Sequence, residues 1–317
     1  MNKIRVSLGS AAILGLRELK MTALSQTIYL MNSGGCEFNC SFCAQAKCAT
    51  SEQDKLSRVS WPEYDLDIVL QALKEKQNNY KRICFQVVNS PRIFKTLAET
   101  TKKIRESTPH SQIAITIRTY KPEDIEAVFN AGADEVGLSI DAVNEEQFAK
   151  IKGGNLKIYQ DFILHTADKY PGKIATHLIV GMGETEKEMV DMIQELHEHE
   201  VIIALFAFTP VKGAKLEFKQ EPNISSYRRI QVALYLVRNN LDKSFVYNDN
   251  GQITNFGYNK EELVNILKDS NVFETSGCKD CNRPYYNERV GDKDLYNYPC
   301  KVADDKFVQI LESIYEF

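Results

Sequence analysis

The 317-residue chain has no strongly basic segment and a formal net charge of −4, so its charge does not suggest a nucleic-acid partner. No hydrophobic run is long enough to span a membrane, and residues 1–20 lack the apolar core of a secretion signal. We therefore expect a globular protein of the cytoplasm with no membrane partner. No linker rich in glycine, serine or proline divides the chain, which favours one domain.

Histidine is scarce and cysteine is grouped. All five histidines lie before residue 200, whereas six of the eight cysteines form two groups of three. We call these groups the cluster-loop cysteines (Cys36, Cys40 and Cys43) and the C-terminal cysteines (Cys278, Cys281 and Cys300). Disulfides are rare in the cytosol, so the grouping indicates metal or redox chemistry.

The cluster-loop cysteines have the spacing C-x3-C-x2-C and follow a strand-like run. A structural zinc site normally takes four ligands. A cubane iron–sulfur cluster held by three thiolates instead leaves one iron for a ligand from outside the protein. The aromatic Phe42 stands directly before the third cysteine. The pattern favours an iron–sulfur cluster, with a zinc loop and a chance grouping as the alternatives.

The C-terminal cysteines have the spacing C-x2-C-x18-C, again with three thiolates. No histidine lies near them, so a zinc ion would need Asp280 or Asp292 as its fourth ligand. A disulfide plus a spare thiol is disfavoured inside a cell. The segment 283–298 is rich in tyrosine and charge, as expected for a loop folded around a metal. We predict a second iron–sulfur cluster here and keep zinc as the alternative.

Strand-like and helix-like runs alternate along the chain, which predicts a parallel α/β sheet. The strands are expected at 27–32, 82–88, 112–117, 134–140, 173–180, 202–208, 245–247 and, more weakly, 271–274. The helices expected between them include 64–76, 91–107, 122–131, 186–199 and 225–238. About eight such units predict a TIM-type (β/α)8 barrel over residues 1–270. Residues 271–317 would form a C-terminal extension that packs on the barrel and binds the second cluster.

The run Asn32–Gln45 resembles the cluster loop of the radical S-adenosylmethionine (SAM) enzymes and, within that superfamily, of biotin synthase. The likeness continues over most of residues 25–255. It implies a [4Fe–4S] cluster on the cluster-loop cysteines, SAM bound to the open iron, and Phe42 beside this cofactor. Barrel enzymes carry their chemistry at the carboxyl ends of the strands, which is where this loop is expected.

Polar residues at two other strand ends are candidates for SAM binding. Ser139 and Asp141 end the fourth strand and could hold ribose hydroxyls or the SAM amino group, although capping of the next helix would also explain them. Gly181 and Glu184 lie in a glycine-rich turn before a helix, and this turn resembles the segment that borders adenine in the superfamily. An ordinary turn with Thr185 as the helix N-cap is the alternative.

Two cations at strand ends are candidates for substrate binding. Arg118 ends the third strand, where a guanidinium can bind a carboxylate through two parallel hydrogen bonds. Lys212 follows the sixth strand and could meet an anionic substrate. Each could equally be an exposed surface charge.

Biotin synthases insert sulfur between two unactivated carbons of dethiobiotin. The resemblance implies that a reduced cluster cleaves SAM to methionine and a 5′-deoxyadenosyl radical, which abstracts hydrogen from the substrate, and that a second, sacrificial cluster supplies the sulfur. The protein would then be a sulfurtransferase. Its expected partners are dethiobiotin, a reductant such as flavodoxin or ferredoxin, and cluster-assembly proteins, and a homodimer is left open.

The chain departs from the usual biotin synthase at the sulfur-donor site. That site is a [2Fe–2S] cluster held by three strand cysteines and an arginine, and here only Cys84 matches. The other positions fall on Ala114, on Ala175 and near Tyr247. We predict that an auxiliary [4Fe–4S]-type cluster on the C-terminal cysteines replaces it. Cys84 is then interpreted as a small buried hydrophobic residue and Cys48 as a bystander.

The nearest alternatives are a hydrogenase-cofactor maturase and a methylornithine-synthase-like mutase, which share the barrel and the first motif. The identity of the product separates both from biotin synthase. A non-catalytic iron–sulfur or zinc protein is a more distant alternative, which a failure to form 5′-deoxyadenosine under strong reduction would indicate.

Overall fold

The computed structural model describes residues 1–21, 23–284, 286–288 and 291–314. Its main sheet has eight strands in the order β10-β9-β8-β7-β6-β2-β1-β5. The parallel part contains β2 (Thr27–Asn32), β6 (Arg82–Gln86), β7 (Gln112–Ile117), β8 (Glu135–Leu138), β9 (Ile174–Val180) and β10 (Ile202–Ala207). At one edge, β1 (Lys3–Val6) and β5 (Glu63–Asp65) continue the sheet in antiparallel pairing. The predicted α/β fold of barrel type is confirmed.

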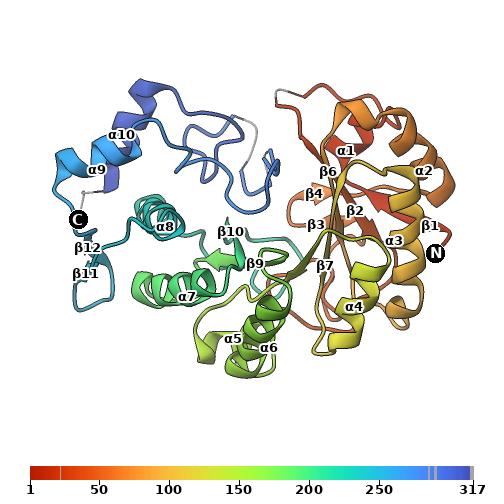
Figure 1. Ribbon diagram of the computed structural model, residues 1–317, viewed down its shortest axis with the longest axis horizontal. Helices are drawn as coiled ribbons and strands as arrows, with labels where there is room; N and C mark the ends of the chain where they lie inside the picture. The colour runs from red at the N-terminus through yellow and green to blue at the C-terminus, as the bar shows by residue number, and fades with distance from the viewer. Residues whose placement is uncertain (22, 285, 289–290, 315–317) are drawn as a thin grey trace.

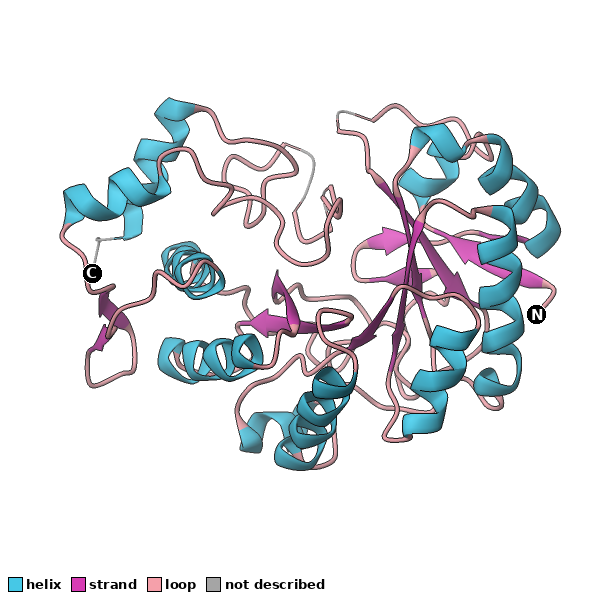
Figure 2. Cartoon of the chain, in the orientation of Figure 1, coloured by secondary structure: helices cyan, strands magenta, loops and turns pink. Residues whose placement is uncertain are grey.

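Helices cover the outer side of this curved sheet (Figures 1 and 2). They are α1 (Leu8–Ile13), α2 (Leu66–Glu75), α3 (Ile93–Ser107), α4 (Pro122–Asn130), α5 (Glu145–Ile151), α6 (Leu156–Lys169), α7 (Glu186–Glu198) and α8 (Ile224–Arg238). On α3, for example, Leu97 and Ile104 are two helical turns apart and both are buried. All five predicted helices are confirmed, with ends that differ by at most two residues.

The two C-terminal strands that we predicted for the barrel do not join the main sheet. β11 (Val246–Tyr247) pairs with β12 (Ile253–Asn255) in a separate hairpin. The strand predicted at 271–274 is wrong, because this segment is a turn in which Glu274 makes only an isolated bridge to Tyr298. The eight strands are completed by β1 and β5, which the sequence did not reveal. β5 carries two exposed acidic residues and no apolar alternation, as an edge strand can.

The C-terminal segment has a hydrophobic core of its own on the α8 side of the barrel. This core joins α9 (Lys260–Leu267) and α10 (Asp304–Ile314) to α8. Within it, the rings of Phe273 and Phe307 have centroids 5.4 Å apart. Buried Arg228 on α8 also donates to the carbonyl oxygen of Tyr296 at 2.7 Å. No helix among the described residues has the length and apolar character that a membrane crossing needs.

From this core, the loop after residue 274 returns to the main sheet (blue in Figure 1). The hydroxyl of Thr27, the first residue of β2, donates to the carbonyl oxygen of Asp280 at 3.0 Å. The side chain of Asn282 donates to the carbonyl oxygen of Leu24 at 2.9 Å and accepts from the amide of Gln26 at 3.1 Å. This loop therefore lies at the amino ends of the strands, whereas the cluster loop follows the carboxyl end of β2.

Candidate active site

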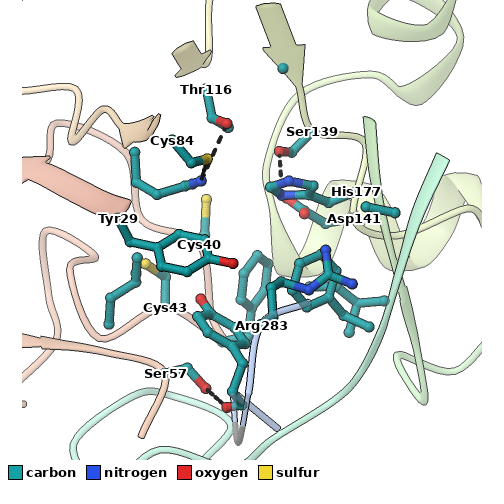
Figure 3. Close-up of a pocket in the computed structure, with 18 of the residues that line it drawn as sticks. Tyr29, Cys40, Cys43, Ser57, Cys84, Thr116, Ser139, Asp141, His177 and Arg283 are labelled. Carbon is teal, nitrogen blue, oxygen red and sulfur yellow. Dashed lines mark hydrogen bonds between the residues drawn. The ribbon is translucent and has the colours of Figure 1, made fainter. Parts of the chain in front are cut away.

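A cavity of about 260 Å³ lies on the inner side of the curved sheet. Alternate residues of the parallel strands line it, as the two-residue repeat of a strand requires. On β6 these residues are Arg82, Cys84 and Gln86. Figure 3 shows Cys84 and His177 on facing sides of the cavity.

All three cluster-loop cysteines line this cavity. Backbone hydrogen bonds hold their loop against two other segments. The amide of Ser41 donates to the carbonyl oxygen of Ile151 at 2.7 Å, and the carbonyl oxygen of Ser41 accepts from Leu216 at 3.0 Å. The amide of Gln45 also lies 3.4 Å from Sγ of Cys43 and favours a thiolate there. The tertiary fold thus brings the three sulfur atoms to one wall of the cavity.

Burial controls the protonation of these thiols. Burial, followed by the charge on Cys40, raises the pKa of Cys43 to about 12. Burial also raises the pKa of Cys40, although the nearby cations Lys152 and Arg118 act in the opposite direction. Both thiols are therefore protonated at neutral pH in the metal-free chain, and a bound metal must displace their protons. Phe42, between them in sequence, lines the same cavity.

Arg118 lies against the cluster loop. Its Nη1 is 3.6 Å from Sγ of Cys40 and 2.9 Å from the carbonyl oxygen of Lys152. Its Nη2 is 2.7 Å from the carbonyl oxygen of Gly153, and the guanidinium stacks 4.2 Å above the ring centroid of Phe38. Its hydrogen bonds to carbonyl oxygens therefore go to the turn after α5, and its contacts with Cys40 and Phe38 link this turn to the cluster loop. The buried Nε has no partner among the described residues. Carboxylate binding by Arg118 stays a prediction.

Ser139 and Asp141 both line the cavity (Figure 3). The hydroxyl of Ser139 is 3.0 Å from Nδ1 of His177. The carboxylate of Asp141 pairs at 2.6 Å with Nζ of Lys152. Lys152 is only 5% exposed, and its Nζ also donates to the carbonyl oxygen of Ile140 at 3.3 Å. Burial lowers the pKa of His177 to about 4, so its ring is neutral at pH 7. Together these residues form a polar wall whose only charges are an ion pair.

The glycine-rich turn after β9 has polar groups that bond one another. Glu184 accepts hydrogen bonds from the amides of Gly181 at 2.7 Å and Met182 at 2.9 Å. Thr185 is the N-cap of α7 and forms a capping box with Glu188, so the ordinary explanation of Thr185 is confirmed. Gly181 and Glu184 are not among the described residues that line the cavity. SAM binding by this turn stays a prediction.

Lys212 lies on the exposed surface. Its carbonyl oxygen accepts a hydrogen bond from the hydroxyl of Ser51 at 2.7 Å. The neighbouring Gly213 has φ +83°, and a Cβ there would lie 2.4 Å from the amide nitrogen of Ser51. This loop is therefore packed on the segment after the cluster loop, and Lys212 is not among the described residues that line the cavity.

Two of the three C-terminal cysteines line the cavity, Cys278 and Cys281. Sγ of Cys281 is 3.4 Å from the hydroxyl of Tyr29 on β2. Cys300 is instead exposed, in the segment that follows Tyr298, and is not one of the described residues of the cavity wall. The structure thus brings two of these three cysteines into the cavity wall.

The two predicted zinc alternatives also lie away from the cavity. The carboxylate of Asp280 pairs with Lys81 at 3.0 Å, and neither Asp280 nor Asp292 is among the described residues that line the wall. Across the described chain, no three histidine, cysteine or acidic side chains are close enough to bind one metal ion. A cluster binds each thiolate through a different iron and therefore spans sulfur atoms that are further apart. Thiolate ligands suit iron–sulfur clusters as well as zinc, so these donor sets fit the predicted clusters.

Two arginines, buried Arg82 and half-buried Arg283, lie beside the thiols at the amino ends of the strands. Arg82 pairs through Nη2 with Glu135, while its buried Nη1 has no partner among the described residues. Arg283 donates through Nη2 to the carbonyl oxygen of Ser276 at 3.1 Å. Burial disfavours the charged form of Arg283, but the charge on Cys281 raises its pKa overall. This end of the cavity therefore has positive charge close to sulfur.

Sequence reasoning missed three of these residues: Lys152, Arg82 and Arg283. The signal for Arg82 was available, because it stands two residues before Cys84 on one strand and so shares its face. Lys152 precedes two glycines after a short helix, which gives no sign of its ion pair with Asp141. Arg283 lies in an irregular loop, and nothing local indicates that it points inward.

The sheet is of barrel type, encloses an inner cavity and carries a three-cysteine loop at the carboxyl end of its first parallel strand. This combination defines a class of barrel enzyme built around an iron–sulfur cluster. The family model of the radical SAM superfamily matches residues 33–196, slightly more than half of the chain. The chain belongs to the radical SAM superfamily, whose members are enzymes that use a [4Fe–4S] cluster and SAM.

Several of the curated relatives are biotin synthases. That of Cytophaga hutchinsonii is 25% identical over 218 residues, which are 65% of this chain and 60% of the relative. That of Clostridium botulinum is 28% identical over 222 residues, 67% of this chain and 65% of the relative. A GTP 3′,8-cyclase of Limosilactobacillus fermentum is 24% identical over 133 residues, 41% of this chain and 40% of the relative. The chain thus spans 40% to 60% of the first of these curated relatives.

Two solved structures share the fold of this chain. The FeFe-hydrogenase maturase HydG of Carboxydothermus hydrogenoformans has a TM-score of 0.52 and 16% identity, covering 75% of this chain and 56% of its own. The methylornithine synthase PylB has a TM-score of 0.54 and 14% identity, covering 74% of this chain and 66% of its own. At these identities the likeness establishes the fold alone.

Proposed function

We propose that this chain is a sulfurtransferase of the biotin synthase type, which inserts sulfur into dethiobiotin and takes the sulfur from an auxiliary iron–sulfur cluster. The observation that carries the proposal is one cavity shared by two sets of cysteines. The cluster-loop cysteines line it near the carboxyl ends of the strands, and Cys278 and Cys281 belong to the loop at the amino ends. A substrate held between them would be within reach of both a radical source and a sulfur source.

The cluster-loop cysteines would hold the SAM-binding [4Fe–4S] cluster. When bound and reduced, this cluster supplies the electron that cleaves SAM to methionine and a 5′-deoxyadenosyl radical. Ser139 and Asp141 would meet the polar parts of SAM, because both line the cavity and the ion pair with Lys152 fixes the Asp141 carboxylate. Phe42 would pack beside the cofactor. The turn at 181–184 would support this site from the end of β9.

The remaining lining suits a substrate with a polar ring and an apolar chain. Dethiobiotin has a cyclic urea and a carboxylate that are joined by methylene groups. Ile179 and Phe206 offer apolar surface in the cavity, and neutral His177 offers hydrogen bonding without net charge. Of the two predicted carboxylate ligands, Arg118 is better placed than Lys212, because only Arg118 lines the cavity.

The distant biotin synthase relatives support this assignment, since they match about two thirds of the chain. The reaction would take place in the cytoplasm with a flavodoxin or ferredoxin as reductant. The test is an anaerobic reaction of the reconstituted protein with SAM, a strong reductant and dethiobiotin, analysed by mass spectrometry. We expect biotin and 5′-deoxyadenosine together.

Matched variants sharpen this test. Cys43→Ala should abolish both products, because it removes a ligand of the radical-generating cluster. Cys281→Ala should abolish biotin and leave some SAM cleavage. Cys48→Ala, at an exposed position outside the cavity wall, should leave both products unchanged. Undiminished biotin formation by Cys281→Ala would contradict the role of the second cysteine set.

A second candidate is a maturase or mutase of the same branch, which the fold neighbours favour. Such an enzyme would also cleave SAM and could also carry a second cluster. It would form 5′-deoxyadenosine in the assay above but no biotin. That result would move the assignment to this candidate and leave the radical chemistry intact.

A further inference from the structure

The strand cysteine Cys84 faces the same end of the cavity as the C-terminal loop. It lies on β6 opposite Tyr29 of β2 in the sheet register, and the hydroxyl of Tyr29 is 3.4 Å from Sγ of Cys281. Cys84, Cys278 and Cys281 all line this cavity. The fold therefore brings the three cysteines to one site, although Cys84 is 194 or more residues away from the other two in sequence.

The loop is fixed in a position that directs its cysteines toward β6. Thr27 and Gln26, which it contacts through hydrogen bonds, lie at the start of β2, the strand next to β6. Around this point the strands carry small residues that line the cavity, namely Ala114, Ala175 and Ala204. Small side chains leave room for a bulky group between the sheet and the loop.

A buried cation without a complete set of partners lies at the same place. The side chain of Arg82 is only 2% exposed, and its Nη1 has no partner among the described residues. Arg82 lines the cavity together with Cys84 and Cys278. An unpaired buried guanidinium nitrogen costs free energy unless an anion or acceptor occupies the neighbouring space. Thiolate or sulfide of a bound cluster would supply that acceptor.

Cys300 has none of these features. It is exposed and lies next to Lys301, whose ammonium pairs with Asp269 at 3.7 Å. Tyr298, two residues before Cys300, bridges to Glu274, which follows α9. Cys300 would have to leave this surface to meet a cluster in the cavity.

We infer that the auxiliary cluster is ligated by Cys84, Cys278 and Cys281, that Arg82 donates to its sulfur atoms, and that Cys300 is not a ligand. The inference rests on the proposed function in assuming that a second cluster is present. Three thiolates leave one iron of a [4Fe–4S]-type cluster without a protein ligand, open to a sulfide. The site unites one strand cysteine with two from the C-terminal loop.

The test compares Cys84→Ala with Cys300→Ala in the full chain after anaerobic reconstitution. The readouts are iron and sulfide per chain and the Mössbauer and EPR spectra. As a control for folding of the barrel, the spectrum of the cluster on the cluster-loop cysteines is recorded in each variant with and without SAM. A change on adding SAM shows that the barrel is folded. We expect Cys84→Ala to lose the auxiliary cluster and keep the SAM-responsive one, and Cys300→Ala to keep both. Loss of the auxiliary cluster from Cys300→Ala, or its retention by Cys84→Ala, overturns the inference.

Alkylation provides a readout that needs no substitution. The reconstituted wild-type protein is treated with iodoacetamide under anaerobic conditions, and the labelled cysteines are mapped by peptide mass spectrometry. We expect label on the exposed Cys48 and Cys300 and none on Cys84. Labelled Cys84 or protected Cys300 overturns the ligand set. The ligand pattern is independent of the product assay, so an enzyme that makes no biotin but shows this pattern refutes the proposed function alone.

Discussion

Replacing Gly277 with alanine should displace the loop that carries Cys278 and Cys281. Gly277 has φ +114°, which L side chains rarely adopt, and a Cβ there would lie 2.7 Å from Cβ of Ala204 on β10. Backbone strain of this kind costs about 1 to 3 kcal/mol. Forcing an extra carbon into a packed contact adds about 1 to 3 kcal/mol. The combined cost of about 2 to 6 kcal/mol favours movement of the loop away from β10.

A second substitution separates these two contributions. Ala204→Gly removes the Cβ that the new methyl group would meet and leaves the backbone strain, so the double variant should recover about 1 to 3 kcal/mol of the loss. Gly172→Ala is the matched control for strain alone. Gly172 also has a positive φ, +65°, but a Cβ there would meet nothing within 4 Å.

The assay combines anaerobic thermal unfolding with the iron content of the reconstituted protein. We expect Gly277→Ala to lower the Tm and to lose auxiliary iron while the cluster-loop cluster remains. The double variant should regain much of both. Equal losses in the single and double variants, or in Gly277→Ala and Gly172→Ala, would refute the packing argument.

Three further predictions concern the polar wall and the cluster loop. Lys152→Met should lower the free energy of unfolding by about 3 to 5 kcal/mol, because the buried Asp141 carboxylate loses its partner. Adding Asp141→Asn should recover part of this loss, measured by chemical denaturation. No recovery in the double variant would contradict the ion-pair explanation. Arg118→Gln should lower the reduction potential of the cluster-loop cluster, since it removes a positive charge 3.6 Å from Sγ of Cys40; an unchanged potential in an EPR-monitored redox titration would exclude this effect. Burial lowers the pKa of His177 to about 4, so between this value and about 6.5 the unfolded chain binds more protons than the folded one. Stability should therefore fall by up to about 3 kcal/mol as the pH drops through this window, and His177→Phe should remove that dependence in thermal unfolding, whereas an unaltered pH profile would disprove the assignment.

The cluster loop and the inner strands were predictable from local sequence. The spacing of Cys36, Cys40 and Cys43 carries its chemistry in eight residues, and no long-range contact is needed to recognise it. The parallel strands are apolar runs bounded by amphipathic helices, which is a strong signal. Both features lie within single βα units, where local pattern and final structure agree.

The edge of the sheet was not predictable in the same way. β1 and β5 are three or four residues long, and β5 has two exposed acidic residues. Such strands form because their antiparallel partner is already in place. Their own residue pattern does not specify a strand. The segments at 245–247 and 271–274 have strand-like composition, but they follow α8 in a part of the chain with its own core and do not join the main sheet.

The C-terminal cysteines show the limit most clearly. Sequence proximity places Cys300 with Cys278 and Cys281, whereas in the fold Cys84, Cys278 and Cys281 line one cavity and Cys300 is exposed. Contacts between residues so far apart depend on how an irregular loop docks on the sheet, and no periodicity encodes that docking. The inward position of Arg283 depends on the same docking.

The measurement that tests the account most directly is a single-turnover reaction with isotopically marked sulfur. The protein is reconstituted with iron and sulfide of a heavy sulfur isotope, freed of loose sulfide, and mixed anaerobically with SAM, a strong reductant and dethiobiotin. We predict biotin that carries the heavy isotope, formed by wild type and Cys300→Ala and absent from Cys281→Ala. Formation of 5′-deoxyadenosine without any labelled biotin in wild type would contradict the central claim that this cavity inserts sulfur from its own cluster.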